Sequence, residues 1–162
     1  MTQSDPEARR PADTRVVLSQ VMQPADANFM GVIHGGIVMK LIDETAGACA
    51  HRFARGRVVT AAIDRIDFHY PVHIGNLVTF KATVNHAGRT SMEIGVRVEA
   101  EDLDTGVITH TNSAYLVLVA IDEDGKPTQV PALEPQSDEE KRRCAAAEAR
   151  RAARQRLREP AD

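Results

Sequence analysis

The sequence predicts an α+β domain in which an antiparallel sheet wraps around one long central helix. Two observations support this prediction. An apolar segment opens at Gly35-Gly36 and runs to about Ala54, which is long enough for about five turns of helix. A series of segments rich in Val, Ile and Thr follows it, and turn residues separate them. A single helix before a long run of strands packs most economically when the sheet covers the helix.

The elements around this helix can be placed in order. Apolar residues alternate from about Arg15, which predicts a first strand over 15–23, and Pro24 to Gly31 is expected to be a loop. Further strands are predicted over 57–63, 66–70, 77–87, 91–101 and 107–121. The turn signals between them are Pro71, Gly75-Asn76, Gly88-Arg89 and Asp104-Thr105-Gly106. The spacing of the last three strands suits antiparallel hairpins.

Length and composition fit one compact domain. The chain has 162 residues, 20 Lys and Arg against 23 Asp and Glu, and 43% hydrophobic residues. We expect a disordered leader over residues 1–13, the folded domain over 14–133, and a charged tail, helical or frayed, over 134–162. The sequence contains no apolar run of membrane-spanning length and no secretion signal, so a soluble, cytosolic protein is predicted.

Charge is distributed unevenly along the chain. Residues 136–162 hold eight basic and six acidic residues, so this tail carries +2 and the remainder −5. Ser137 is a suitable cap for a helix that begins with acidic residues. Because Leu157 is its only large apolar residue, this helix is expected to be solvated and frayed. The alternative is that its basic residues grip anionic groups.

Composition also argues against several classes of function. Cys49 and Cys144 are far apart in the sequence, which suits neither a metal site nor a disulfide. A net charge of −3 with four Phe, two Tyr and no Trp disfavours a nucleic-acid surface. Neither a metal nor a cofactor is predicted.

Two adjacent acidic residues occupy different positions on the central helix. At 100° per residue, Asp43 lies at the edge of the apolar arc, whereas Glu44 points into the polar face and can pair with Lys40. A carboxylate in a half-apolar seam is the better candidate for a perturbed pKa. Position alone leaves both a structural and a catalytic role open for Asp43.

The loop before the helix offers a candidate anion site. Gly35 and Gly36 stand where loop becomes helix, which leaves the backbone amides of the first turn exposed to an oxyanion. The alternative is a tight turn packed under the sheet. Taken singly, Asn28 can simply form an Asx-turn, and His34 can satisfy local backbone groups.

The separation of these candidates constrains how they could cooperate. Gly36 and Asp43 are seven residues apart, which is about 10 Å along a helix. Both cannot then touch one reacting carbonyl. If both serve one reaction, they must come from two copies of the domain packed antiparallel, helix beside helix.

The segment from Ala27 to Gly47, ANFMGVIHGGIVMKLIDETAG, resembles the signature of the hotdog-fold acyl-CoA thioesterases. The resemblance is to the cytosolic long-chain acyl-CoA hydrolase group and its single-domain bacterial relatives, and it covers about Val16 to Pro131. Further agreeing segments are Arg57 to Ala61, Asp67-Phe68-His69, Gly75-Asn76, Ser91 to Ile94 and Asp122 to Pro127.

The resemblance implies a sheet wrapped around one helix and hydrolysis of acyl-CoA to free fatty acid and CoA. In relatives, an Asn before the helix and an Asp in its middle act across a subunit interface, and these positions match Asn28 and Asp43. A single-domain chain should therefore form at least a homodimer and, by analogy with its relatives, a homohexamer built as a trimer of dimers.

On this hypothesis, Asp43 is the general base or the nucleophile, and Asn28 orients the water or the thioester. Amides around Gly35 and Gly36, helped by the helix dipole, hold the developing oxyanion, with Gly36 as the catalytic member. The expected substrate-binding residues are His34 and Gly35 at the helix start, Arg57, Val59, Thr60 and Ala61 along the pantetheine path, and Arg89, Thr90 and Ser91 at a hairpin tip for the CoA phosphates. Residues of the helix seam could line an acyl tunnel or form ordinary core; these are Met39, Ala46, Ala50 and Phe53.

Two other functions could occur on the same fold. A hydratase or dehydratase would need a catalytic His with an acid in its own motif, and His34 with Asp43 does not make that pattern. A non-catalytic acyl-CoA-binding protein remains the alternative.

Overall fold

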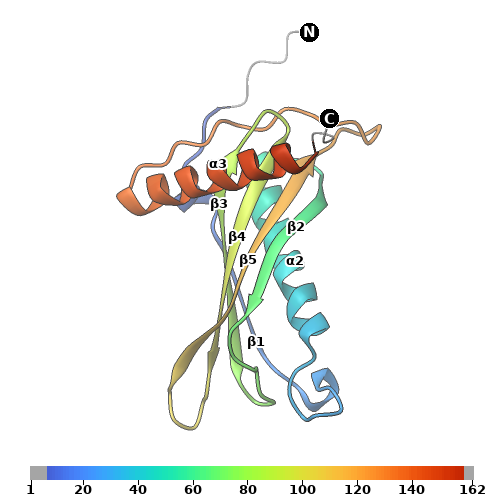
Figure 1. Cartoon of the computed structure of the whole chain (residues 1–162), viewed down its shortest axis with the longest axis vertical. Coiled ribbons are helices and arrows are strands. Elements are labelled where there is room, and N and C mark those ends of the chain that lie inside the picture. The colour runs from blue at the N-terminus through green and yellow to red at the C-terminus, as the bar shows by residue number, and fades with distance from the viewer. Residues whose placement is uncertain (1–6, 159–162) are drawn as a thin grey trace.

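The computed structural model describes residues 7–158 of the chain. The elements in chain order are α1 (Pro11–Thr14), β1 (Val16–Val21), η1 (Pro24–Asp26), α2 (Gly35–Ala54), β2 (Val58–Phe68), β3 (Leu77–Ala87), β4 (Ser91–Glu101), β5 (Ile108–Ala120) and α3 (Asp138–Arg158). Figure 1 shows the long strands forming one curved sheet, with α2 beside it and α3 lying across it.

The sheet has five strands in the order β1-β3-β4-β5-β2, and every pair is antiparallel. This arrangement confirms the predicted α+β class. One detail of the prediction is wrong: the strands expected over 57–63 and 66–70 are a single strand, β2. The register of β2 on β5 shifts once at Ala61 and once at Asp64, and each β-bulge absorbs an extra residue without ending the strand.

The hydrophobic core lies between α2 and one face of the sheet. Its residues on α2 include Val38, Leu41, Ile42, Ala46, Cys49, Ala50 and Phe53. They pack against alternate residues of β3, β4 and β5, among them Phe80, Ile94, Leu116 and Leu118. Burial raises the pKa of the Cys49 thiol to about 12, so this cysteine behaves as a packed apolar residue.

Helix α3 lies on the opposite face of the sheet. The sequence predicts a solvated, frayed helix here, whereas the structure packs one side of α3 against the sheet. Leu157 is 86% exposed and contributes no anchor. The helix instead buries Ala147 and pairs Arg150 with Glu93, which is 2% exposed and points out of β4. Small residues let the helix approach the sheet closely, and ion pairs hold it there. A count of large apolar residues detects neither kind of contact.

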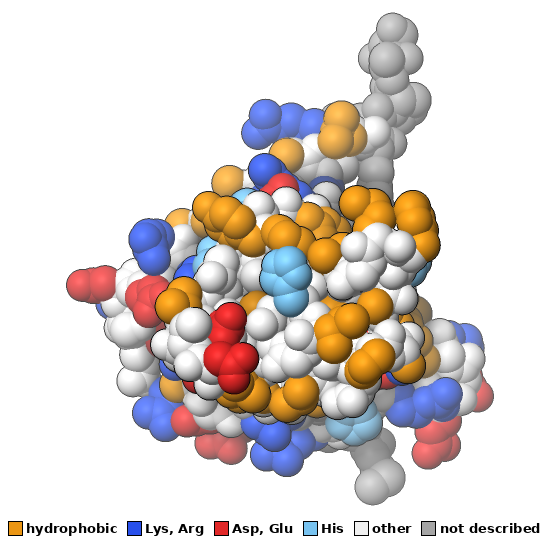
Figure 2. All heavy atoms as spheres, turned by 90° about the horizontal axis from the view of Figure 1, so that it is seen from below, with side chains coloured by type: hydrophobic (Ala, Val, Ile, Leu, Met, Phe, Trp, Pro, Cys, Tyr) orange, Lys and Arg blue, Asp and Glu red, His pale blue; other side chains and the backbone are white. Residues whose placement is uncertain are grey.

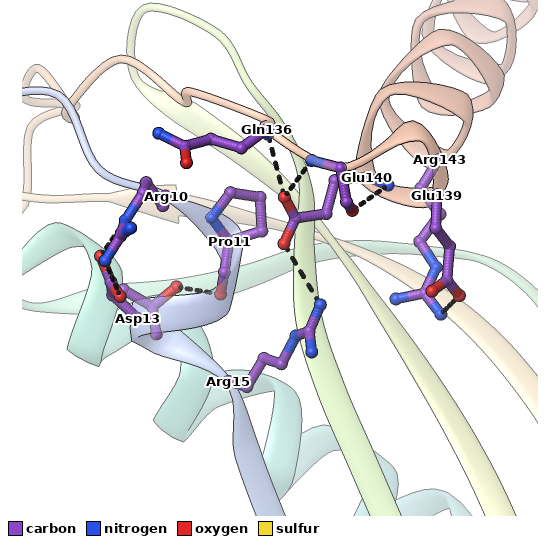
Figure 3. A network of polar contacts seen from close by, with 10 residues as sticks. Arg10, Pro11, Asp13, Arg15, Gln136, Glu139, Glu140 and Arg143 are labelled. Carbon is purple, nitrogen blue, oxygen red and sulfur yellow. Dashed lines mark hydrogen bonds and ion pairs between the residues drawn. The ribbon is translucent and has the colours of Figure 1, made fainter.

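The start of α3 follows the predicted capping. Ser137 Oγ accepts the Glu140 amide at 3.2 Å, and Glu140 accepts the Ser137 amide in return. Backbone N–H groups from Gln136 and Ser137 hold the pKa of the Glu140 carboxyl below its ordinary value. Arg15 also reaches this carboxylate, at 3.2 Å, so the network ties the start of α3 to the segment before β1 (Figure 3).

Residues 1–6 of the expected leader lie outside the described residues. Residues 7–13 are ordered by main-chain contacts with the rest of the domain. Arg9 forms a parallel bridge with Leu133, and Pro11 begins the short helix α1. These contacts are main-chain pairings between distant segments, so the polar composition of the leader does not reveal them. Within residues 7–158, no helix has the length and apolar character needed to cross a membrane.

Candidate active site

Asp43 lies halfway along α2 and is half-buried, as expected for the edge of the apolar face. Thr60 of β2 donates its hydroxyl to Asp43 Oδ1 at 2.7 Å. The other oxygen of this carboxylate accepts no hydrogen bond from the described residues. Its neighbour Glu44 is exposed and pairs with Lys40 at 3.4 Å, as predicted. The two acids therefore have different surroundings, and only Asp43 is oriented by a residue of the sheet.

The first turn of α2 is capped by His34. Its Nδ1 accepts the Gly36 amide at 2.9 Å, which is the local backbone role that the sequence left open for this histidine. A side chain on Gly36 would place Cβ 3.0 Å from that ring nitrogen. The Gly36 amide is therefore engaged. The Gly35 amide has no partner within residues 7–158, so it is the first-turn donor that remains available.

Asn28 lies in the loop before α2 and forms an Asx-turn, in which its Oδ1 accepts the Met30 amide at 2.9 Å. Gly31 closes this turn with a φ of 80°, and its amide donates to the Asn28 carbonyl at 3.0 Å. The turn fixes the amide plane of Asn28. Its Nδ2 has no acceptor among the described residues and can donate to a ligand.

The remaining candidates gather at the other end of the sheet. The Ala120 amide donates to the Thr90 carbonyl and the Ile121 amide to the Arg57 carbonyl, both at 2.9 Å. The carboxyl end of β5 thus joins the Arg89-Thr90-Ser91 turn to the start of β2. Val59, Thr60 and Ala61 continue along the exposed outer edge of that strand.

Within one protomer the candidates therefore form two groups. Gly35 lies against the Phe68 ring at the end of β2, whereas Arg57 precedes its start. The helix start and the middle of α2 remain about 10 Å apart, since α2 is one continuous helix. Neither group alone supplies both an oxyanion donor and the acid.

The α2 residues considered for an acyl tunnel differ in their exposure. Ala46, Ala50 and Phe53 are fully buried in the core of the protomer, which fits the alternative that they are ordinary core residues. Met39 is 40% exposed and stands one turn before Asp43. Figure 2 shows hydrophobic side chains spread over the end of the molecule where α2 begins, and Phe29 and Met30 of the loop before α2 are 99% and 72% exposed.

The sequence interpretation missed a shallow hollow that starts one turn after Asp43. It has a volume of about 630 Å³, and the residues that line it include Gly47, His51, Arg52, Arg55 and Val58. Basic residues spaced along the polar face of the helix were the signal that could have indicated it. No group of three or more His, Cys, Asp or Glu side chains in residues 7–158 is arranged to hold a metal ion.

Known proteins resemble this chain over most of its length. Residues 30–107 match the family model of the thioesterase superfamily. The chain is 44% identical over 130 residues to protein VdlD of Helicobacter pylori, covering 80% of this chain and 74% of that protein. It is 36% identical to the uncharacterized acyl-CoA thioester hydrolase YkhA of Bacillus subtilis, covering 83% and 78%. The cytosolic acyl coenzyme A thioester hydrolase of Rattus norvegicus is 33% identical, and the chain spans 37% of that longer protein.

Solved structures show the same similarity. An apo-hexameric acyl-CoA thioesterase superposes with a TM-score of 0.92 at 39% identity, over 96% of this chain and 99% of that one. The acyl-CoA hydrolase of Staphylococcus aureus, in complex with butyryl coenzyme A, coenzyme A and coenzyme A disulfide, has a TM-score of 0.87 at 32% identity, over 93% and 92%. That hydrolase has also been solved as single alanine variants of an asparagine, an aspartate and a threonine.

Proposed function

This chain belongs to the thioesterase superfamily, within its hotdog-fold group of acyl-CoA thioester hydrolases, and we propose that it hydrolyses fatty acyl-CoA to free fatty acid and coenzyme A. The observation that carries the proposal is the carboxylate of Asp43, oriented by Thr60 and left with one oxygen free. Relatives named cytosolic also support a cytoplasmic location.

Attack on the thioester carbonyl is the step of the reaction that most needs help from the protein. A CoA thiol resembles an ordinary thiol, with a pKa of about 8.5, and leaves as the thiolate without strong acid assistance. Asp43 serves as general base on a water molecule or attacks the carbonyl directly. Because Thr60 holds Oδ1, the lone pairs of Oδ2 are the ones aimed at water or substrate.

The oxyanion that develops needs donors that are already in place. The unpartnered Gly35 amide at the start of α2, with the positive end of the helix dipole, supplies one. Asn28 Nδ2, held by the Asx-turn, supplies a second donor that orients the water or the thioester. Of the Gly35 and Gly36 amides expected to hold the oxyanion, this assignment keeps Gly35, because the Gly36 amide donates to His34.

The two groups of residues are completed by a second copy of the chain. No strand among residues 7–158 pairs with the outer edge of β2, which exposes Val59, Ile63 and Phe68 at 45%, 42% and 53%. Pairing of two such edges continues the sheet and brings the α2 helices together. The Asn28 and Gly35 donors of one protomer can then face Asp43 of its partner. A hexameric relative supports the further assembly of three dimers.

The variants of the S. aureus hydrolase support the same three residues. The replaced asparagine, aspartate and threonine are separated in that chain by the same intervals as Asn28, Asp43 and Thr60 here. For the CoA moiety, backbone groups of Arg57 and of the first residues of β2, to Ala61, line the pantetheine, and Arg89 to Ser91 contact the phosphates.

The test measures thiol release from acyl-CoA substrates of several chain lengths. Asp43→Ala should lose at least about 100-fold in kcat, because the attacking step loses its base or nucleophile. Glu44→Ala is the matched control, since this acid is adjacent but exposed, and it should keep wild-type activity. Asp43→Ala with wild-type turnover would rule out the mechanism. Binding of acyl-CoA without thiol release by the wild type would instead identify a non-catalytic binding protein.

A single turnover in oxygen-18 water separates the two roles of Asp43. Label that enters the Asp43 carboxylate indicates nucleophilic attack, because water then cleaves an acyl-aspartate. Label found only in the fatty acid shows that water attacks the acyl carbon, as general-base catalysis requires, and absence of a covalent acyl-Asp43 adduct by mass spectrometry then excludes nucleophilic attack.

A further inference from the structure

A charged cluster joins α3 to the sheet at the strand that supplies Thr60. Arg154 forms an ion pair with Asp64 of β2 and lies 3.6 Å from Glu93 of β4. Glu93 is held at 2.6 Å by Arg150, whose guanidinium lies 3.8 Å from the centroid of the Tyr115 ring. Two guanidinium groups thus face two carboxylates in a partly buried setting, where removing one partner leaves an uncompensated charge. Figure 1 shows the carboxyl-terminal end of α3 over this part of the sheet.

Asp64 is one of two bulge residues in β2. The pairing of β2 with β5 skips Ala61 and skips Asp64, so neither has a partner on β5. Each bulge exchanges the two faces of the strand beyond it, because side chains alternate with a period of two. The two bulges together restore the original phase. Thr60 and Ile66 therefore both face α2, opposite buried residues of β5.

Loss of the bulge at Asp64 would break this arrangement. Either Thr60 would turn away from α2, or Ile66 would leave the core against which it packs. The Asp64 side chain is 14% exposed, and its ion pair with Arg154 anchors the bulge from the opposite face of the sheet.

We propose that Arg154 is a positioning residue for the candidate catalytic site. Through Asp64 it fixes the second bulge of β2, and through the register of β2 it presents the Thr60 hydroxyl to Asp43. The proposal rests on the proposed function of Asp43. It makes α3 a working part of the enzyme, and a displacement of about 1 Å at a reacting group is sufficient for a loss of about 100-fold in rate.

The first test compares Arg154→Ala with Arg156→Ala, an exposed arginine of the same helix. Arg154→Ala should lower kcat about 10-fold or more, because the carboxylate is misplaced, and should change KM by a smaller factor, because Arg89 to Ser91 hold the CoA phosphates from outside β2. Arg156→Ala should match the wild type, and Arg154→Lys should recover part of kcat. Unchanged kcat in folded Arg154→Ala would overturn the proposal.

A second test asks whether Arg154 acts through Thr60. In a Thr60→Ala background, Arg154→Ala should cost less than about twofold further in kcat, because the contact that it positions is already gone. The same loss in both backgrounds would mean that Arg154 acts by another route and would overturn the proposal. Thermal unfolding of each variant checks that the domain remains folded.

Hydrogen exchange separates this inference from the proposed function. If the wild type releases no thiol from any acyl-CoA, the proposed function fails, and exchange of the β2 amides decides the role of Arg154. Faster exchange over residues 58–65 in Arg154→Ala, with wild-type exchange in Arg156→Ala, supports the anchoring of β2. Equal exchange in both variants contradicts it.

Discussion

At the scale of single residues, the contact between Thr60 and Asp43 is the decisive feature of the candidate site. The hydroxyl donates at 2.7 Å and leaves one carboxylate oxygen free. A carboxylate that rotated freely would spend part of its time turned away from the thioester. The hydrogen bond reduces that freedom before the substrate arrives, which lowers the entropic cost of the reactive geometry.

Replacement of Thr60 tests this role. Thr60→Val keeps the shape of the side chain and removes the hydroxyl, so kcat for acyl-CoA should fall about 10- to 100-fold. Thr60→Ser keeps the hydroxyl and should retain most of the activity. Steady-state thiol release measures both, and equal activity of the Val and Ser variants would contradict an orienting role for the hydroxyl.

Gly95 on β4 shows how a single residue sets the packing under α3. A Cβ at this position would lie 2.5 Å from Nδ2 of the buried Asn85. Gly95→Ala should therefore lower the free energy of unfolding by about 1–3 kcal/mol, because the added methyl group overpacks the site. Gly88→Ala is the control, since its Cβ would meet Ser91 at an ordinary 3.6 Å. Urea unfolding measures the difference, and equal stabilities would contradict the packing argument.

At the scale of elements, α3 is held to the sheet by polar contacts and one small buried residue. The capping box of Ser137 and Glu140 fixes its start, and ion pairs fix its later turns. The helix carries the positioning residue Arg154, so the strength of its attachment bears on activity as well as on stability.

The capping box predicts a pH dependence of stability. Because the pKa of folded Glu140 lies below its ordinary value of 4.5, its contribution is full above pH 4.5 and is lost as pH falls through the folded pKa. The gap in unfolding free energy between the wild type and Glu140→Gln, about 1 kcal/mol at neutral pH, should therefore close at lower pH.

Thermal unfolding from pH 7 to pH 3 measures that gap. Glu139→Gln is the control, because its surface ion pair with Arg143 is 54% exposed on the Glu139 side and contributes little. A gap that persists at low pH would contradict a role for the ionised Glu140 carboxylate.

At the scale of the whole molecule, the protomer divides its candidate residues between two places. The donors lie at the start of α2, the acid lies in its middle, and a rigid helix keeps them apart. The free edge of β2 and its exposed apolar side chains provide the surface through which two protomers can bring these groups together.

The assembly can be tested at this edge. Ile63→Arg places a charge at an exposed apolar position of β2, so it should convert the assembly to monomers and abolish thiol release, because burying an unpaired charge is costly. Val17→Arg is the control on the opposite edge strand, β1, where Val17 is 63% exposed, and it should preserve the dimer. Analytical ultracentrifugation measures the state of each variant, and an active monomer of Ile63→Arg would rule out a shared site.

Sequence patterns within single segments predict most of the secondary structure of this protein and several of its local contacts. Hydrophobic periodicity predicted the central helix, and β-rich segments predicted the strands over 77–87 and 91–101 with the bounds of β3 and β4. The positions of Glu44 beside Lys40 and of the Ser137 cap also follow from local spacing, because each depends on residues at most four apart.

Tertiary structure decided what distant segments do to one another. Thr60 meets Asp43, Arg154 meets Asp64, and two bulges keep β2 continuous where the sequence predicts a break. These contacts depend on the register of β2 against β5 and on the face of the sheet to which α3 is attached. The sequence pattern of one segment reports only the periodicity of that segment. It therefore predicts the helix and the strands, but it does not predict how they are placed relative to one another.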